Sequence, residues 1–364
     1  MSSLCEQTAG MDNERYWQEL ISRITNQRVP FSGSLALTHR CNLKCLHCYA
    51  REDAEPEMPR SELGTGQWLK IIGDIKNGGC LYLLLTGGEP LLRDDFPEIY
   101  SFAKKSGFLV TVFTNGTLVA GRVLDLFQEL PPRLVEISLY AASAEIHDRI
   151  TGVPGSFTRA LQAIDELIGR KIRIGLKSVL MTLNEAEFPA IEGLARQYGA
   201  RFRLDAALFP TLAGGRSPLD LRVSPERAVE REFSDPDRVR EWREFYRHYR
   251  GLATGEKLYI CGAGTRTFHV DPTGHLYPCL MVREHGHSLL SGGFARAWNG
   301  EVARARGEEA DAGSPCFDCR EKIACGYCPG FFAMENGSAR VPSEYLCAIG
   351  KLRQAAINSE SPGG

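Results

Sequence analysis

Three features that mark other protein classes are missing from this sequence of 364 residues. No apolar run approaches the ~20 residues that span a bilayer, and residues 1–20 contain no apolar segment typical of a secretory signal. Neither sign of charge prevails, because 43 Lys and Arg residues are balanced by 45 Asp and Glu residues. Nucleic-acid binders need a basic surface. We therefore expect a cytoplasmic protein that binds neither a membrane nor nucleic acid.

Cysteine, in contrast, is abundant, with twelve residues. In a reducing compartment thiols are seldom paired as disulfides, so metal binding or redox chemistry is the better explanation for so many. Three cysteines lie between residues 41 and 48 and seven between 261 and 347, which leaves only Cys5 and Cys80 isolated. Cys80 precedes the apolar run "LYLLL" and is expected to be a small core residue.

The chain alternates short apolar runs with amphipathic stretches from about residue 34. The expected strands are 34–38, 81–86, 108–114, 134–140, 172–181 and 201–208, and the expected helices include 61–77, 94–106, 155–169 and 185–198. This alternation predicts an α/β fold, a partial (β/α)6 barrel of parallel strands with helices outside. Ligands bind at the C-terminal ends of the strands in such folds.

The composition also suggests where one part of the chain ends and the next begins. Residues 1–33 are expected to form a helical segment, 34–222 the barrel, and 223–255 a helical linker that opens at Ser224–Pro225. Residues 256–350 are rich in cysteine, glycine and turns, which predicts a small domain held together by bound metal. Residues 351–364 are expected to be a tail.

The first cysteine group, Cys41, Cys45 and Cys48, has the spacing C-x3-C-x2-C and directly follows the first expected strand. A closed structural zinc site needs four ligands. Three thiolates instead match a [4Fe–4S] cluster held at three irons, with the fourth iron open to a ligand from outside the protein. A zinc site is the alternative explanation.

This loop resembles that of the radical S-adenosylmethionine (SAM) enzymes, and the resemblance extends to "TGGEP" (86–90) at the end of the second strand. It implies that SAM chelates the open iron and that one electron cleaves it to a 5′-deoxyadenosyl radical. His47 stands where the family usually has another aromatic residue. The SAM-binding residues that the resemblance implies are Gly87, Gly88, Glu89 and Pro90 for the amino group, Ser138 for the ribose, Asn115 for a polar contact and Arg149 for the carboxylate.

The second cysteine group resembles the SPASM extension of these enzymes, which holds auxiliary iron–sulfur clusters. The resemblance implies a fully ligated cluster on Cys316, Cys319, Cys325 and Cys347, and a second cluster with three thiolates on Cys261, Cys279 and Cys328. Cys325 and Cys328 enclose two residues where the family usually has three. The alternative is a zinc ribbon built from the two C-x2-C pairs. His269 and His275 are further candidate ligands, although a structural role in a hairpin is expected for both.

The resemblance implies an enzyme that abstracts hydrogen from a peptide or protein, giving a crosslink, excision or oxidation in ribosomal peptide maturation. Leu280 follows Cys279 where formylglycine-forming members carry Asp, which argues against that activity. Because about 33 residues precede the barrel, we expect either a separate leader-peptide-binding protein or direct docking of the peptide. A flavodoxin or ferredoxin is expected as reductant. No catalytic acid or base is assigned. Tyr140, Asp205, Tyr277 and Tyr327 are candidates by position only.

Two other functions remain open from the sequence. The first is SPASM-type chemistry on a small molecule such as a haem-type tetrapyrrole precursor. The second is a non-catalytic iron–sulfur electron carrier. The motif "GGEP" with Ser138 and Arg149 argues against the carrier, because an electron carrier has no use for a SAM pocket.

Overall fold

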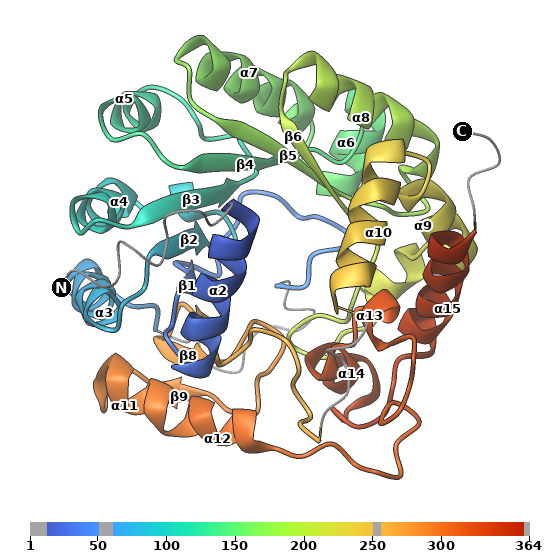
Figure 1. Cartoon of the computed structure of the whole chain (residues 1–364). Helices are drawn as coiled ribbons and strands as arrows, with labels where there is room; N and C mark the ends of the chain where they lie inside the picture. Colours follow the sequence, from blue (N-terminus) through green and yellow to red (C-terminus); the bar gives the residue numbers. More distant parts are fainter. Residues whose placement is uncertain (1–12, 51–60, 250–255, 360–364) are drawn as a thin grey trace.

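Six parallel strands form the centre of the molecule in this computed structural model, which describes residues 13–50, 61–249 and 256–359. They follow one another in chain order across the sheet. Their bounds are β1 (Ser32–Ala36), β2 (Tyr82–Thr86), β3 (Leu109–Thr114), β4 (Leu134–Ser138), β5 (Ile174–Val179) and β6 (Arg201–Asp205). The curved sheet does not close on itself, and helices lie on its outer side (Figure 1). The expected partial (β/α)6 barrel is confirmed.

The expected barrel helices are present within a few residues of their predicted bounds. They are α3 (Thr65–Asn77), α4 (Phe96–Lys105), α7 (Ser156–Gly169) and α8 (Phe188–Gln197), with the short turns η1 (Pro90–Leu92) and η2 (Glu185–Glu187). Two further helices, α5 (Arg122–Glu129) and α6 (Ala144–Thr151), were not predicted. Each has only eight residues, so its apolar periodicity is too short to stand out in the sequence.

Strands β1, β2 and β3 bury alternate residues, and this alternation decides what each face contacts. On β2, for example, Leu83 and Leu85 are buried while their neighbours are partly exposed. The buried set packs against the outer helices in one apolar core that includes Trp68, Phe96 and Phe127. Side chains of the opposite set, such as Ser34 and Thr86, line a cavity inside the barrel. The strands are therefore less uniformly apolar than the sequence suggested.

The segments on either side of the barrel are helical. The N-terminal helix is α2 (Asn13–Asn26). The turn η3 (Ser217–Leu221) ends the segment expected to form the barrel, and the expected linker forms α9 (Pro225–Glu232) and α10 (Pro236–Tyr249). The Ser224 side chain caps α9 by accepting from the backbone N–H of Arg227, as the Ser–Pro start predicted. No helix within the described ranges is long and apolar enough to cross a membrane.

The cysteine-rich segment continues the barrel sheet. Strand β7 (Thr267–Val270) pairs in parallel with β1, and β8 (His275–Tyr277) and β9 (His287–Ser288) extend the sheet to nine strands. Gly274 has a φ of +84° at the β7–β8 turn, a conformation that favours glycine. Gly33 of β1 leaves room for the ring of Phe268, which a Cβ would meet at 2.1 Å. The parts that the sequence divided at residue 256 therefore share one sheet.

Five helices complete the C-terminal part of the chain. They are α11 (Gly293–Asn299), α12 (Glu301–Gly307), α13 (Lys322–Cys325), α14 (Pro329–Asn336) and α15 (Glu344–Asn358). Ile349 of α15 belongs to the same core as the barrel strands. Residues 351–358 are therefore helical, although the sequence suggested a tail from residue 351, and 360–364 lie outside the described residues.

Candidate active site

A cavity of about 330 Å³ lies inside the barrel, at the end where the parallel strands terminate. All three cysteines of the first group line it, together with Gly87 and Gly88 from the loop after β2. Leu280 and Met281 from the C-terminal part form another wall. The cavity therefore joins the cysteine loop, the glycine turn and the cysteine-rich domain, as expected for ligand binding at this edge of the sheet.

The cysteine loop is anchored to the end of α6. The backbone N–H groups of Lys44 and Leu46 donate to the carbonyls of Thr151 and Ile150, at 2.8 and 2.9 Å. Gly152 ends this helix with a φ of +68°, and a Cβ there would lie 3.0 Å from the Lys44 carbonyl oxygen. A helix that the sequence did not reveal therefore positions the loop.

The sulfur atoms of this loop are suited to an iron–sulfur cluster. Cys41 Sγ accepts from the backbone N–H of Leu43 at 3.4 Å and from Asn115 Nδ2 at 3.9 Å, and hydrogen bonds to sulfur are a means of tuning such clusters. Burial and the neighbouring Cys48 and Cys41 raise the pKa of the Cys45 thiol. No group of three or more His, Cys, Asp or Glu side chains within the described ranges is arranged to hold a single metal ion. All three thiols face the same cavity, where they could together ligate an iron–sulfur cluster.

The turn at Gly87 and Gly88 approaches the backbone just before Cys41. Gly87 has a φ of +144°, and a Cβ at Gly88 would lie 2.2 Å from the carbonyl oxygen of Arg40. The Gly88 and Glu89 N–H groups donate to the carbonyls of Thr38 and Arg40, both at 2.8 Å. Only glycine permits so close an approach, so the two motifs found in the sequence form one wall of the cavity.

Glu89 is fully buried behind this wall. Its carboxylate accepts from the backbone N–H groups of Leu91 and Asn115 and from the hydroxyl of Thr114, at 3.1, 2.8 and 2.8 Å. Burial raises the pKa of Glu89 to about 7, although these three hydrogen bonds oppose the rise. Pro90 is also buried and begins η1. Glu89 therefore ties the glycine turn to the end of β3.

Two of the remaining expected cofactor contacts line the cavity and one does not. Asn115 and Ser138 are cavity residues, and Asn115 Nδ2 also donates to Asn42 Oδ1 at 2.9 Å. Asn42, between Cys41 and Cys45, was not singled out in the sequence. Arg149 is exposed on α6 and is not among the cavity residues. The structure therefore separates Arg149 from the other expected SAM contacts.

Several charged cavity residues were not found from the sequence. Glu136, Lys177 and Arg203 point inward from β4, β5 and β6, and Arg203 Nη1 lies 3.4 Å from Glu136 Oε1. Asp205, a candidate by position, also lines the cavity. Glu136, Lys177 and Arg203 lie on three different strands, so only the pairing of those strands brings them together.

The other candidates lie at different distances from the cavity. Tyr140 lines it and packs against His47, with ring centroids 4.4 Å apart. His269 also lines it, and its Nδ1 lies 2.8 Å from Ser34 Oγ. His275 Nδ1 lies 2.9 Å from Thr273 Oγ1 within the hairpin, and Tyr277 donates to Asp271 there. These contacts hold the side chains of His275 and Tyr277 within the hairpin.

The C-terminal cysteines have other cysteines among their neighbours, and their assignment to two clusters stays a prediction. Burial, followed by Cys347, Cys319 and Cys316, raises the pKa of Cys325 to about 12. Burial also raises the pKa of Cys328 to about 12, and there the neighbouring thiols are Cys279 and Cys261. The structure thus brings together four thiols in one place and three in another.

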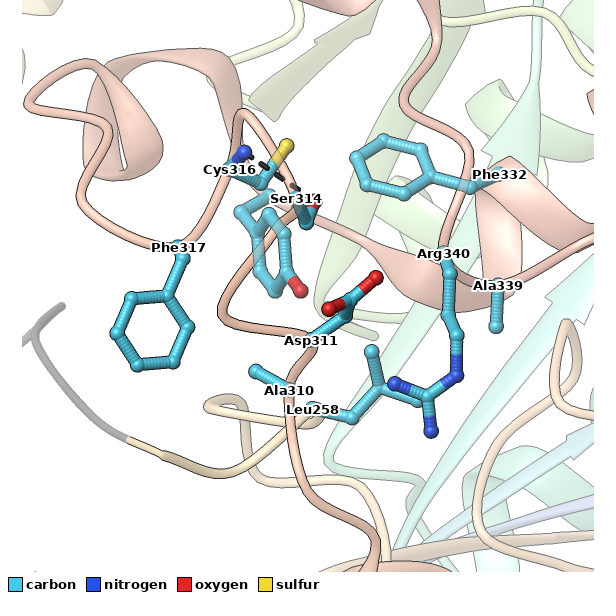
Figure 2. Close-up of a pocket in the computed structure, with 10 residues that line it drawn as sticks. Leu258, Ala310, Asp311, Ser314, Cys316, Phe317, Phe332, Ala339 and Arg340 are labelled. Carbon is cyan, nitrogen blue, oxygen red and sulfur yellow. Dashed lines mark hydrogen bonds between the residues drawn. The ribbon is translucent and has the colours of Figure 1, made fainter.

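Figure 2 shows the surroundings of Cys316, whose backbone N–H donates to Ser314 Oγ at 3.3 Å. The neighbouring pocket holds about 10 Å³, hardly the space of one water molecule. Tyr327 also lines this pocket.

The two isolated cysteines lie apart from these groups. Cys80 is buried near the carbonyls of Phe31 and Tyr82, as expected of a core residue, while Cys5 lies outside the described residues.

Known proteins resemble this chain in sequence and in fold. The Radical SAM superfamily matches residues 35–195. The mycofactocin maturase MftC of Mycolicibacterium smegmatis is 32% identical over 311 residues, which cover 82% of this chain and 77% of that protein. The AdoMet-dependent heme synthase of Methanosarcina barkeri is 27% identical and covers 80% of this chain and 89% of its own length.

A solved structure shares the fold over almost the whole chain. Streptococcus suis SuiB bound to the precursor peptide SuiA matches with a TM-score of 0.70 and 15% identity, covering 91% of this chain and 79% of SuiB. The family match covers the barrel that contains the cysteine loop and the glycine turn, and the similarity to MftC extends well beyond it. This chain therefore belongs to the radical SAM superfamily.

Proposed function

We propose that this radical SAM enzyme modifies a peptide or protein substrate in ribosomal peptide maturation. Its family uses SAM and a [4Fe–4S] cluster, which together supply a hydrogen-abstracting radical when they are bound. The observation that carries the proposal is the shared cavity, since Leu280 and Met281 of the cysteine-rich part lie on the same cavity as Cys41, Cys45 and Cys48. MftC, which is similar to this chain across both the barrel and much of the cysteine-rich part, is named a maturase.

In this proposal the cysteine loop and Asn115 hold the cluster side of the cavity, and the glycine turn with Ser138 holds SAM. The C-terminal thiols hold one or two auxiliary iron–sulfur clusters. Leu280 makes the wall beside Cys279 apolar, so no carboxylate base stands there, which argues against formylglycine formation. The carboxylates that do line the cavity are Glu136 and Asp205, and Glu136 is paired with Arg203.

The partners belong to the same proposal. A flavodoxin or ferredoxin in the cytoplasm would deliver the electron, and a separate protein would bind the leader of the peptide. Co-purification of the tagged full chain with each candidate, encoded near its gene, would test these partners. Retention of neither protein would remove them from the proposal.

The direct test begins with anaerobic reconstitution and a count of iron and sulfide. About twelve irons per chain are expected from three four-iron clusters, and about ten if the three-cysteine site holds a smaller cluster. After reduction, SAM should yield 5′-deoxyadenosine, and Cys41→Ala should abolish it. Zinc in place of iron at the C-terminal cysteines would contradict the auxiliary clusters alone.

The substrate is tested by mass spectrometry with the short peptides encoded beside the gene. A mass change that requires both SAM and Cys41 supports the peptide assignment. The heme synthase similarity favours a second candidate, a tetrapyrrole with carboxylate side chains. Conversion of such a tetrapyrrole, with every peptide unchanged, would replace the first proposal by the second. The electron-carrier alternative is not supported, because members of this superfamily are enzymes.

A further inference from the structure

A small annex of about 30 Å³ adjoins the main cavity, between the end of β1 and the cysteine-rich part. Tyr49, His269 and Leu280 line both spaces, so the annex lies directly beside the cavity. The thiols of the cysteine loop line the cavity but not the annex, whereas Arg283 of the cysteine-rich part lines the annex. The annex therefore belongs to the C-terminal wall of the site and not to the cysteine loop.

Arg283 is held at this annex with one amino group left over. Its Nη2 donates to Asp271 Oδ2 at 3.2 Å, and its guanidinium carbon lies 3.8 Å from the ring centroid of Tyr277, which fixes the plane of the group. Its Nη1 is buried and has no hydrogen-bond partner within the described ranges. Asp271 also accepts from Thr273, His275 and Tyr277. Asp271 therefore compensates the charge of Arg283 only in part.

His39 brings a second unpartnered nitrogen to the same annex. Its backbone N–H donates to Glu62 Oε1 at 2.7 Å, but its side-chain Nε2 is buried and finds no hydrogen-bond partner among the described residues. Burial lowers the pKa of His269 to about 3, and the charges of Arg283 and His39 act in the same direction, while Asp271 opposes them. Arg283 and His39 therefore both lie near His269, which stays neutral.

Two buried nitrogens without partners on one small space favour a ligand with two acceptor atoms. The annex has room for about two water molecules, which is also the room that one carboxylate group needs. A guanidinium with a free amino group and a second N–H donor suit such a group. We propose that Arg283 and His39 bind a carboxylate of the substrate, whose remaining part lies in the main cavity. The inference deepens the proposed function and rests on it, since that function brings a carboxylate-bearing molecule into the cavity.

The test uses small carboxylates as probes on the anaerobically reconstituted full chain, saturated with SAM so that the cofactor carboxylate is not what is measured. N-acetylglycine represents the C-terminus of a peptide, propionate represents a side-chain carboxylate, and N-acetylglycinamide is the uncharged comparison. Ligand-observed NMR titrations with oxidised clusters give the dissociation constants. The wild type should bind at least one carboxylate more tightly than the amide. Arg283→Gln should weaken that binding ~10-fold or more, and His39→Phe should weaken it by a smaller factor.

The control variant is Arg304→Gln, whose side chain on α12 is 73% exposed, and it should bind the probes as the wild type does. Arg283→Lys, which keeps a charge beside Asp271, replaces Arg283→Gln if the latter fails to load iron. SAM affinity, measured by anaerobic calorimetry at equal iron content, should be the same in Arg283→Gln and the wild type. An anaerobic crystal structure with the tighter probe should show its carboxylate at Arg283 Nη1 and His39 Nε2.

Three results would overturn the proposal: equal binding of N-acetylglycine and its amide with no binding of propionate, a carboxylate bound elsewhere in the crystal, or a loss of SAM affinity that matches the loss of probe affinity. Tighter binding of N-acetylglycine would identify the C-terminus of a peptide as the group that is bound, and tighter binding of propionate would identify a side-chain carboxylate. Because no substrate is turned over, failure of this site is distinguishable from failure of the peptide assignment, which mass spectrometry tests.

Discussion

Among the residues of the site, Glu89 is a fully buried carboxylate that accepts three hydrogen bonds. Its side chain has no exposed surface, and its three hydrogen-bond donors come from η1 and from the end of β3. The sequence indicated Glu89 as a contact for the SAM ammonium. The structure adds that its carboxylate also organises the loop of Asn115, which is a cavity residue.

The first prediction concerns the pH dependence that Glu89 imposes. Burial raises its folded-state pKa from 4.5 to about 7, so the folded state retains a proton that the unfolded state has lost. This contribution to stability is fully present below pH 4.5 and is lost as the pH rises to 7. The unfolding free energy of the cluster-free wild type, relative to Glu89→Gln, should fall by about 3 kcal/mol over that window. Urea denaturation across pH 4–8 measures it, and a difference that stays constant would contradict the assigned cause.

A second prediction concerns the close approach at Gly88. In Gly88→Ala the new Cβ would meet the Arg40 carbonyl at 2.2 Å, so the backbone before Cys41 must move. We expect a loss of about 1–3 kcal/mol in unfolding free energy and weaker SAM binding at equal iron content. Gly193→Ala in α8 is the control, because nothing lies within 4 Å of its Cβ position. Equal behaviour of the two variants in denaturation and SAM titration would rule out this role.

At the level of elements, the pairing of β1 with β7 links the barrel to the cysteine-rich segment. The ring of Phe268 crosses the space above Gly33 and packs against Phe294, with ring centroids 5.0 Å apart. Arg28 strengthens this junction by donating to the carbonyls of Gly264 and Trp298. The cavity therefore has a C-terminal wall because a strand, and not only a linker, joins the two parts.

The third prediction addresses this pairing. Gly33→Ala places a methyl group 2.1 Å from the Phe268 ring, which is held by its own neighbours. We expect faster amide hydrogen exchange across residues 267–270, with the exchange of β3 and β4 unchanged. Gly66→Ala, on the open side of α3, is the comparison and should leave β7 protected. Unchanged protection of β7 in Gly33→Ala would show that the sheet tolerates the methyl group.

At the scale of the whole molecule, a mostly buried ion pair joins the last barrel loop to α14, the helix that follows Cys328. Arg222 Nη1 lies 2.6 Å from Glu335 Oε1, with side chains 12% and 10% exposed. Arg222 also donates to the Leu208 carbonyl beside the cavity and stacks on Tyr345 at 4.5 Å. This pair connects a cavity wall at Leu208 to the cysteine-rich part, at a junction separate from β7.

The fourth prediction follows from the burial of this pair. Arg222→Met leaves the Glu335 carboxylate buried without its partner, so we expect a loss of about 3–5 kcal/mol in unfolding free energy. Adding Glu335→Gln should restore part of it, since the uncompensated charge is then removed. Arg227→Met breaks the more exposed pair with Glu185 and should lose less than ~1 kcal/mol. A similar loss in both single variants, measured by chemical denaturation, would contradict the argument.

Local sequence was sufficient for the fold class and for the densest motifs. The βα alternation predicted the barrel, because each strand and helix shows its own periodicity. The cysteine loop and "GGEP" could be recognised because each motif lies within one short segment. The two C-terminal cysteine groups were predicted from their resemblance to SPASM domains. The eight-residue helices α5 and α6 were missed because their periodicity is too short.

Only the tertiary structure decided which separate residues meet. Lys177, Arg203 and Glu136 occupy three strands, and it is the register of β4, β5 and β6 that places them on one cavity wall. The same holds for β7, whose partner is more than 230 residues away in the chain, and for Arg149, which the turn of α6 leaves exposed. Alternation within a segment tells which residues share a face, but the neighbours of that face depend on long-range strand pairing, which no single segment encodes.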